Sequence, residues 1–283
     1  MKFALCNEVL QPLPFERQCK LAARLGYDGL EVAPFTLADD PMTLTDAQAA
    51  EARRIAEGHG LRVFGLHWLL VAPAGLSIVA DDATARRRTV DVMRRLCALC
   101  EILGGSYLVH GSPKQRSVPP GVDRAVARER ARDALAQAAE AAAAHRVTYC
   151  LEPLAPAETD LFNTVAEAAA LVEEVGSPAL RTMIDCSAAG QAEAEPVHAL
   201  MERWMPRGLI GHVQVNDPNR RGPGEGALDF APILQVLQRM EAEGHFPGVV
   251  GVEPFDYVPD GPGCAAHAIG YLRGIRQGLA FHG

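Results

Sequence analysis

Carboxylates and one amide recur in this sequence directly after or within short apolar runs. Glu152 follows the run VTYCL, Asp185 ends RTMID, Gln214 lies in GHVQVND and Glu253 follows GVVGV. Carboxylates on apolar strands are costly unless a positive charge compensates them, and oxygen ligands favour Mg2+ or Mn2+ over metals that prefer thiolates. Side chains from neighbouring strand ends can meet around one ion, because adjacent strands lie about 4.8 Å apart. The alternative is that each acid caps a helix or pairs with an arginine.

Histidines end three runs of the same kind, at His67, His110 and His212. His212 and Gln214 are two residues apart on one predicted strand, so both side chains face the same side. One of them could bind the metal and the other a substrate, and the spacing alone leaves both assignments open. Trp68, next to His67, could close a pocket wall over an apolar part of the substrate, or simply pack against its neighbours.

These residues need strands that end at a common edge. Apolar or β-branched runs alternate eight times with longer segments rich in Ala, Leu, Arg and Glu. This alternation predicts parallel strands with right-handed crossovers, and eight units in this length fit a closed (β/α)8 TIM barrel, one domain over residues 1–283. In such a barrel the C-terminal ends of the strands carry the chemistry. The predicted strands are Lys2–Cys6, Gly29–Val32, Arg62–His67, Ser106–His110, Thr148–Glu152, Arg181–Asp185, Ile210–Val215 and Gly248–Glu253.

Helices are predicted between these strands, with signals at several of their ends. Asp46 and Asp82 are good N-cap residues. Gly26, Gly104 and Gly176 stand where helices should end, a position that favours left-handed residues. The predicted helices are Pro14–Leu25, Asp46–His59, Asp82–Leu103, Asp123–His145, Thr164–Val175, Pro196–Trp204, Phe230–Glu243 and Gly263–Gln277.

The net charge and the cysteines narrow the classes of function. A formal charge of -8 argues against a nucleic-acid partner and against an anionic membrane surface. No apolar run approaches about 18 residues, so no membrane span is predicted. Seven cysteines and a start without the pattern of a secretory signal indicate reduced thiols and a cytoplasmic location. We interpret the pair Cys97 and Cys100 as buried helix residues.

Four segments resemble the xylose isomerase-like barrel superfamily, in its sugar phosphate isomerase/epimerase branch. They are LEP at 151–153, IDCSAAG at 184–190, GHVQVNDPNRRGPGEGALDF at 211–230 and VGVEPF at 250–255. The resemblance covers nearly the whole chain, and the superfamily includes ketose 3-epimerases of the D-tagatose type and hydroxypyruvate isomerase. It implies a TIM barrel and an isomerase or epimerase that acts on a small sugar or a hydroxy-keto acid.

The resemblance also implies a ligand set and a mechanism. On the seventh strand the pattern H-V-Q is similar to the H-x-Q of hydroxypyruvate isomerases, which places Gln214 on the metal and His212 beside the substrate; His212 as the ligand is the alternative. One Mn2+ or Mg2+ ion is implied, with Co2+ or Zn2+ as alternatives. Glu152 and Glu253 are implied as the catalytic pair that moves a proton through a metal-bound enediolate. The implied metal ligands are Glu152, Asp185, Gln214 and Glu253.

Substrate contacts are implied on several loops. Arg220 matches a substrate-binding arginine of the family, and Glu158 matches a glutamate that binds sugar hydroxyls. His67 and His110 are expected to line the substrate pocket, with satisfied structural histidines as the alternative.

Two loops near the predicted site carry further expectations. Lys114 and Arg116, after the fourth strand, could bind a carboxylate or a phosphate, or lie in a solvated loop. The segment DYVPDGPG, after the last strand, is expected to form a non-helical connection that helps to enclose the substrate, with Phe255 and Tyr257 as contact surface.

Two departures from the family pattern leave other functions open. Ala188 stands where most of these enzymes have a histidine, and the segment similar to EPLNR is EPLAP. The first alternative is therefore a lyase on the same metal site: a dehydratase, a decarboxylase or a ketoglycoside-eliminating enzyme. An AP endonuclease, which needs that histidine, and a non-catalytic sugar-binding barrel are further alternatives. The resemblance also implies a homodimer or a homotetramer.

Overall fold

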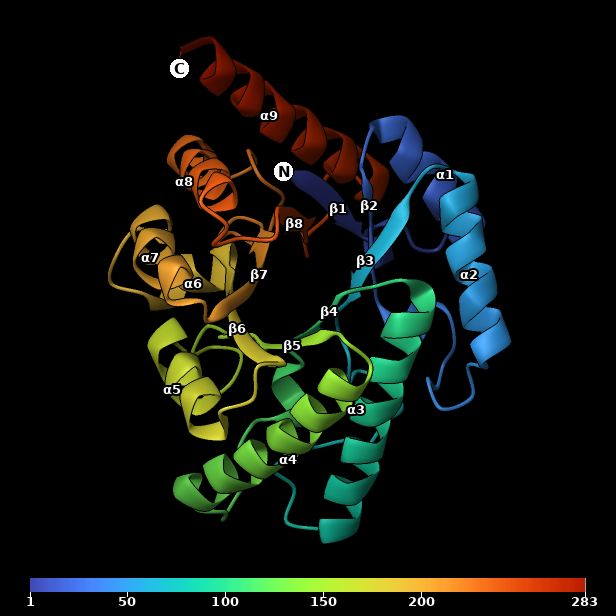
Figure 1. Ribbon diagram of the computed structural model, residues 1–283, viewed down its shortest axis with the longest axis vertical. Helices are drawn as coiled ribbons and strands as arrows, with labels where there is room; N and C mark the ends of the chain where they lie inside the picture. Colours follow the sequence, from blue (N-terminus) through green and yellow to red (C-terminus); the bar gives the residue numbers. More distant parts are fainter. Residues whose placement is uncertain (283) are drawn as a thin grey trace.

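The computed structural model describes residues 1–282 and contains eight parallel strands in a closed barrel. Each strand pairs with the next in sequence, and β1 pairs with β8, so the barrel has no open edge. Figure 1 shows the strands around a central axis with the helices outside them. The predicted TIM barrel is confirmed. The strands are β1 Lys2–Cys6, β2 Gly29–Val32, β3 Arg62–Leu66, β4 Tyr107–His110, β5 Thr148–Leu151, β6 Leu180–Asp185, β7 Ile210–Val215 and β8 Val249–Val252.

Helices connect the strands, and short 3-10 helices follow several strands directly. The α-helices are α1 Phe15–Leu25, α2 Asp46–Gly58, α3 Ala83–Leu103, α4 Arg124–Ala144, α5 Val165–Val175, α6 Cys186–Ala192, α7 Val197–Trp204, α8 Phe230–Ala242 and α9 Gly261–His282. The 3-10 helices are η1 Asn7–Leu10, η2 Pro34–Thr36, η3 Pro113–Gln115 and η4 Met205–Arg207. None of the described helices is long and apolar enough to span a membrane.

The helix ends test the capping predictions. Asp82 caps α3 as predicted, because its side chain accepts a hydrogen bond from the backbone N–H of Thr84. Asp46 is not a cap: Thr45 caps α2 and forms a capping box with Gln48. Asp46 is the first residue of that helix, where its negative charge interacts favourably with the positive end of the helix dipole.

Two segments differ from the sequence-based prediction. Helix α6 begins directly after the last residue of β6, whereas no helix is predicted there. Helix α9 begins at Gly261, so the expected non-helical connection after β8 is limited to residues 253–260. Tyr257, within that connection, is 36 % exposed.

Two apolar layers hold the barrel. The larger one lies between strands and helices and includes Leu5, Leu30 and Val213, none of which is exposed to solvent. A smaller cluster, which includes Phe64 and Met183, fills the inside of the barrel. Inside the barrel, strand register sets which of the buried polar side chains meet.

Candidate active site

Three buried carboxylates converge at the C-terminal end of the barrel. Glu152 follows β5, Asp185 ends β6 and Glu253 follows β8. One carboxylate oxygen of each lies within 4.8 Å of the others, and the three residues are 3–5 % exposed. The structure thus brings together three of the four residues predicted as metal ligands.

Hydrogen bonds fix the orientation of Asp185. Its Oδ1 accepts the backbone N–H of Ala188 in the first turn of α6, and its Oδ2 accepts the side-chain amide of Asn216, both at 2.7 Å. Asn216 also donates to the backbone carbonyl of Glu253 at 3.1 Å and accepts the N–H of Ser187 at 2.7 Å. Asn216 therefore ties three neighbouring strand ends together. The sequence prediction missed it, although it lies two residues after Gln214 on the same side of the strand.

Glu253 is held by only one of its two oxygens. Its Oε1 accepts a hydrogen bond from the indole N–H of Trp68 at 2.9 Å and lies 3.0 Å from Nδ1 of His67. Its Oε2 is buried and has no hydrogen-bond partner. One side of this carboxylate is therefore fixed, and the other is available to a cation or to a substrate proton.

Glu152 lies against a glycine and close to a buried arginine. A Cβ atom at Gly111 would lie 2.1 Å from Oε2 of Glu152, so a larger residue there would displace this carboxylate from its present position. Arg116 is fully buried; its Nη1 donates weakly to the carbonyl of His110 at 3.4 Å, and its Nε and Nη2 have no partner. The expectation of a solvated loop is wrong for Arg116 and correct for Lys114, which is exposed.

The raised pKa values of the three carboxyl groups indicate that a nearby positive charge would stabilise their ionised forms. Burial and the neighbouring Glu253 raise the pKa of Asp185 to about 8. Burial and the other carboxylates likewise raise the pKa of Glu152 well above its usual value, and burial raises that of Glu253. Like charges in a dry site cannot all be ionised without a counter-ion. The all-oxygen donor set and the unpartnered Oε2 of Glu253 fit one hard divalent cation.

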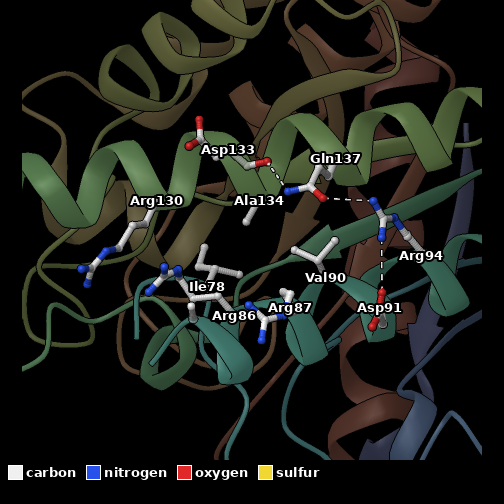
Figure 2. A pocket seen from close by; sticks show the side chains of 11 residues that line it. Ile78, Arg86, Arg87, Val90, Asp91, Arg94, Arg130, Asp133, Ala134 and Gln137 are labelled. Atoms are coloured by element: carbon white, nitrogen blue, oxygen red, sulfur yellow. Dashed lines mark hydrogen bonds and ion pairs between the residues drawn. The ribbon is translucent and has the colours of Figure 1, made fainter. Parts of the chain in front are cut away.

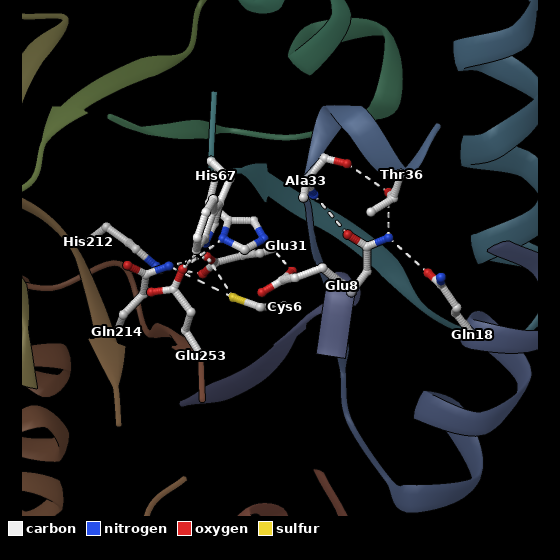
Figure 3. Close-up of polar contacts among 12 residues, drawn as sticks. Cys6, Glu8, Gln18, Glu31, Ala33, Thr36, His67, His212, Gln214 and Glu253 are labelled. Atoms are coloured by element: carbon white, nitrogen blue, oxygen red, sulfur yellow. Dashed lines mark hydrogen bonds and ion pairs between the residues drawn. The ribbon is translucent and has the colours of Figure 1, made fainter. Parts of the chain in front are cut away.

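Glu31 lies one layer deeper in the barrel (Figure 3). Unlike the three carboxylates above it, its charge is compensated by neighbouring side chains. It accepts hydrogen bonds from the hydroxyl of Tyr107 at 2.8 Å and from Nε2 of Gln214 at 2.9 Å, and it lies 2.6 Å from Nε2 of His212. Although burial raises the pKa of Glu31, His212 and Tyr107 outweigh it and lower the value to about 2. A Cβ at Gly251 would lie 2.1 Å from its Oε1, so this position also needs glycine.

The two polar residues predicted on β7 point toward this deeper layer. His212 is fully buried and stacks on Tyr107 with ring centroids 4.0 Å apart, so it lies beneath the cavity and not in its wall. Gln214 is level with Asp185 in the strand register, and its Oε1 is buried without a partner while its Nε2 is bound to Glu31. The amide oxygen of Gln214 is thus free to accept a further ligand.

His67 connects Glu253 to a glutamate that the prediction did not assign. Nε2 of His67 lies 2.9 Å from Oε2 of Glu8, the second residue of η1, and both side chains are buried. Burial lowers the pKa of His67, but Glu8 and Glu253 together raise it well above the usual value. Glu8 lies just after β1 and Glu31 lies near the end of β2, so their position beside strand ends was the available sequence signal.

His110 is fully buried behind the site. Its Nδ1 lies 2.8 Å from the hydroxyl of Tyr149, and its Nε2 has no hydrogen-bond partner. Burial, assisted by the charge of Arg116, lowers the pKa of His110 to about 3, so the ring is neutral.

A cavity of about 60 Å³ opens above the carboxylates. Glu158 and Arg220 face each other across its rim, with 3.8 Å between Oε1 and Nη1, and the guanidinium of Arg220 lies 4.9 Å from the ring centre of Phe255. Of the predicted substrate contacts, Trp68, Glu158 and Arg220 line this cavity, and His67, His110 and His212 do not. The lining residues are Trp68, Gly111, Ser112, Pro113, Glu152, Leu154, Glu158, Arg220, Glu253 and Phe255.

A larger hollow, of about 430 Å³, lies between α3 and α4 on the outside of the barrel (Figure 2). Arginines dominate its lining, and they are engaged locally. Arg94, for example, contacts Asp91 at 3.2 Å and Gln137 at 3.0 Å, and Arg130 contacts Asp81 at 3.0 Å. Exposed ion pairs of this kind contribute little and are common on helix surfaces. Cavity volume therefore does not identify the active site of this barrel.

Comparison with curated proteins finds sugar epimerases and isomerases. The chain is 27% identical to a D-psicose 3-epimerase of Ruminiclostridium cellulolyticum over 82% of this chain and 75% of that protein. It is 30% identical to an L-ribulose 3-epimerase of Mesorhizobium japonicum over 66% of this chain and 60% of that protein. A 2-oxo-tetronate isomerase of Cupriavidus necator matches at 29% over 45% of this chain and 49% of that protein.

Solved structures agree on the fold. A D-psicose 3-epimerase from Clostridium cellulolyticum superposes with a TM-score of 0.80 at 21% identity, over 97% of this chain and 99% of that one. A family model described as xylose isomerase-like TIM barrel matches residues 19–275. This chain belongs to the xylose isomerase-like TIM-barrel family, in its sugar phosphate isomerase/epimerase branch.

Proposed function

We propose that this protein is a metal-dependent isomerase or epimerase of a small sugar or hydroxy-keto acid. The observation that carries the proposal is the convergence of Glu152, Asp185 and Glu253 beside a cavity, with pKa values raised by burial and mutual repulsion. Strongly perturbed carboxyl groups in a cleft are typical of proton-transfer sites. The relatives, which are named as ketose epimerases and as an isomerase of an oxo acid, support the same class of reaction.

Glu152 and Glu253 are proposed as the catalytic pair. Both line the cavity, and they reach it from strands on different sides of the barrel mouth. One carboxylate removes a proton from the carbon next to the substrate carbonyl, and the other returns a proton to a different face or carbon. Trp68 holds Oε1 of Glu253, which leaves Oε2 to act on the substrate.

Asp185 is proposed as a metal ligand together with Glu152 and Glu253, and Gln214 supplies its free Oε1 as the fourth ligand. The donor set is all oxygen, which suits Mn2+ or Mg2+. A bound divalent ion would act as a Lewis acid, polarise the substrate carbonyl and so lower the cost of removing the neighbouring proton. Asn216 and the first turn of α6 keep Asp185 oriented for this role.

The substrate contacts proposed here are narrower than those predicted from the sequence. Glu158 and Arg220 on the rim offer an acceptor and a donor for hydroxyl groups, and Trp68 supplies an apolar wall. His67 acts by holding Glu253. His212 acts by holding Glu31 beneath the site. His110, buried behind the cavity, is proposed to support the loop that carries Gly111.

A lyase on the same site is the second candidate. The observation that favours it is Ala188, a buried methyl group where an imidazole would otherwise help to handle the substrate. The first proton transfer is the same in both reactions. They differ in whether the second step returns a proton or expels a leaving group, so the mass of the product separates them.

The test is proton exchange at carbon in D2O. Protein loaded with Mn2+ would be incubated with D-psicose, L-ribulose, a four-carbon oxo acid and a keto-glycoside, and deuterium incorporation would be followed by mass spectrometry and NMR. We expect incorporation next to the carbonyl, with product mass otherwise conserved. Exchange that persists in Glu152→Gln and Glu253→Gln would contradict the proposal, and a product lighter by water or carbon dioxide would establish the lyase.

A further inference from the structure

Cys6, Glu8, His67 and Glu253 form a second group of metal-capable side chains next to the carboxylates already described. One atom of each lies within 4.8 Å of the others, and all four residues are buried. They come from β1, η1 and the ends of β3 and β8, so barrel closure between β1 and β8 is what assembles the group. Figure 3 shows these side chains turned toward one another.

The hydrogen-bond pattern of the group is incomplete. Oε2 of Glu8, Nε2 of His67 and Oε2 of Glu253 are all buried without a hydrogen-bond partner among residues 1–282. Oε2 of Glu8 and Nε2 of His67 are nevertheless only 2.9 Å apart. If Nδ1 of His67 donates its proton to Glu253, a lone pair of Nε2 faces the carboxylate of Glu8. This contact is stable only with a positive charge between or beside the two atoms.

The charges of the buried side chains at the C-terminal end of the barrel also indicate a further cation. Glu8, Glu152, Asp185 and Glu253 are four carboxylates in one buried region, and Arg116 is a buried cation whose charge acts on Glu152. Arg116 and one divalent ion would still leave one negative charge uncompensated. A second metal ion bound through the unpartnered atoms of Glu8, His67 and Glu253 would supply the remaining charge.

We propose that Cys6, Glu8, His67 and Glu253 form a second cation site with the ligand chemistry of Zn2+. A thiolate, an imidazole and two carboxylates are the donors that zinc binds in tetrahedral sites. Bond lengths of about 2.0–2.3 Å place tetrahedral ligands roughly 3.3–3.7 Å apart, so side-chain shifts of about 1 Å would close this group around an ion. The Cys6 thiol, which now points to Oε2 of Glu31 at 3.5 Å, would lose its proton on binding.

The second site shares Glu253 with the first. An ion held there would occupy the oxygen that the proposed function leaves free for proton transfer, so we expect Zn2+ in the second site to lower turnover. This consequence rests on the proposed function. The existence of the site does not, because it concerns only how many ions bind and through which atoms.

The test counts ions and detects a metal–thiolate bond. Full-length protein freed of metal with a chelator would be titrated with Co2+, with bound equivalents measured by mass spectrometry and cobalt–thiolate charge transfer measured by near-ultraviolet absorption. We expect two equivalents and a thiolate band in the unaltered protein. Cys6→Ser and Glu8→Gln should bind one equivalent, the former without the band. Cys97→Ser, a buried cysteine of α3, is the matched control and should keep both signals.

Several outcomes would decide the question. One equivalent without a thiolate band in the unaltered protein would overturn the second site and assign the charge to a proton on His67; this measurement needs no variant and stands even where a variant fails to fold. A band that survives Cys6→Ser would also overturn it. Asp185→Asn should abolish the first site and keep the band. Absence of deuterium exchange in Mn2+-loaded protein would count against the proposed function alone, because the cobalt count is independent of turnover.

Discussion

Two buried carboxylate groups occupy successive layers of this barrel and have opposite electrostatic character. Glu31 has no solvent exposure, yet three side chains compensate its charge: His212, Tyr107 and Gln214. Glu152, Asp185 and Glu253 are also buried, but they lie close enough together to raise one another's pKa. The pKa is accordingly lowered to about 2 for Glu31 and raised to about 8 for Asp185.

The difference shows that burial alone does not mark a site. A buried carboxylate with a full set of donors is a structural anion, because its desolvation is offset within the protein. A buried group of carboxylates that repel one another needs a cation, and groups with strongly perturbed pKa values cluster at functional sites. The comparison predicts that substitutions in the two layers change different quantities, namely activity in the upper layer and stability in the deeper one.

The largest expected effect is on catalysis in the upper layer. Glu152→Gln removes one member of the proposed proton-transfer pair, and we expect turnover to fall about 10²–10⁴-fold, the usual contribution of an acid or base. Removal of one repelling charge should leave the metal-free protein at least as stable as before. Exchange kinetics and denaturant unfolding would measure the two effects. Glu129→Gln, at an exposed position of α4, is the control and should change neither.

The next effect is on stability in the deeper layer. Glu31→Gln leaves His212 and Tyr107 without their anion, and breaking a buried pair in this way costs about 3–5 kcal/mol of unfolding free energy. Because folding lowers the pKa of Glu31 from 4.5 to about 2, its contribution is present above pH 4.5 and is lost as the pH falls toward 2. The stability difference between the two proteins should therefore shrink over that interval in urea titrations. A constant difference would mean that Glu31 is not ionised in the folded state.

A third effect links metal binding to pH. In the metal-free protein Asp185 keeps a proton up to about pH 8 that the unfolded chain releases near its ordinary pKa of 3.8. The folded state then binds more protons than the unfolded state, so metal-free stability should fall as the pH rises between these values. A metal ion replaces the proton, so the increase in melting temperature on adding Mn2+ should grow from pH 6 to pH 8. Calorimetry at both values checks this, and a pH-independent increase would argue against Asp185 as a ligand.

The smallest effect concerns the fixed side of Glu253. Trp68→Phe keeps an aromatic ring near Phe35 and Phe255 but removes the N–H that holds Oε1. A hydrogen bond to a charged group is worth about 1.5–3 kcal/mol, so we expect kcat to fall by roughly tenfold or more with little change in folding. Trp204→Phe in α7, outside the site, is the matched control and should leave kcat unchanged.

The sequence predicts the barrel and the upper carboxylates well because both follow from strand periodicity. A residue directly after an apolar run lies at the C-terminal end of a parallel strand, so Glu152, Asp185 and Glu253 were placed together without coordinates. Side-chain direction does not follow from that rule. His212 and Gln214 share a face of β7, and both contact Glu31, a partner on β2 that only barrel closure brings near.

The sequence also did not show which loop residues are buried. Arg116 lies two residues from the exposed Lys114 in a segment rich in proline, and only the fold of η3 shows that one is enclosed and the other solvated. Helix α6 was missed because it has only seven residues, CSAAGQA, too few to show a helical repeat of apolar residues. Its first turn is stabilised by Asp185 itself, through the N–H of Ala188.

The most direct test of the account is the position of a bound ion. Crystals of the full chain soaked in Mn2+ would be measured at the manganese absorption edge, and an anomalous difference map would locate the metal without reference to activity. We expect a peak within bonding distance of Glu152, Asp185 and Glu253, and none within bonding distance of Glu31. No peak at these three carboxylates when Mn2+ is saturating, or a peak bonded to Glu31, would contradict the claim that the uncompensated layer is the metal site.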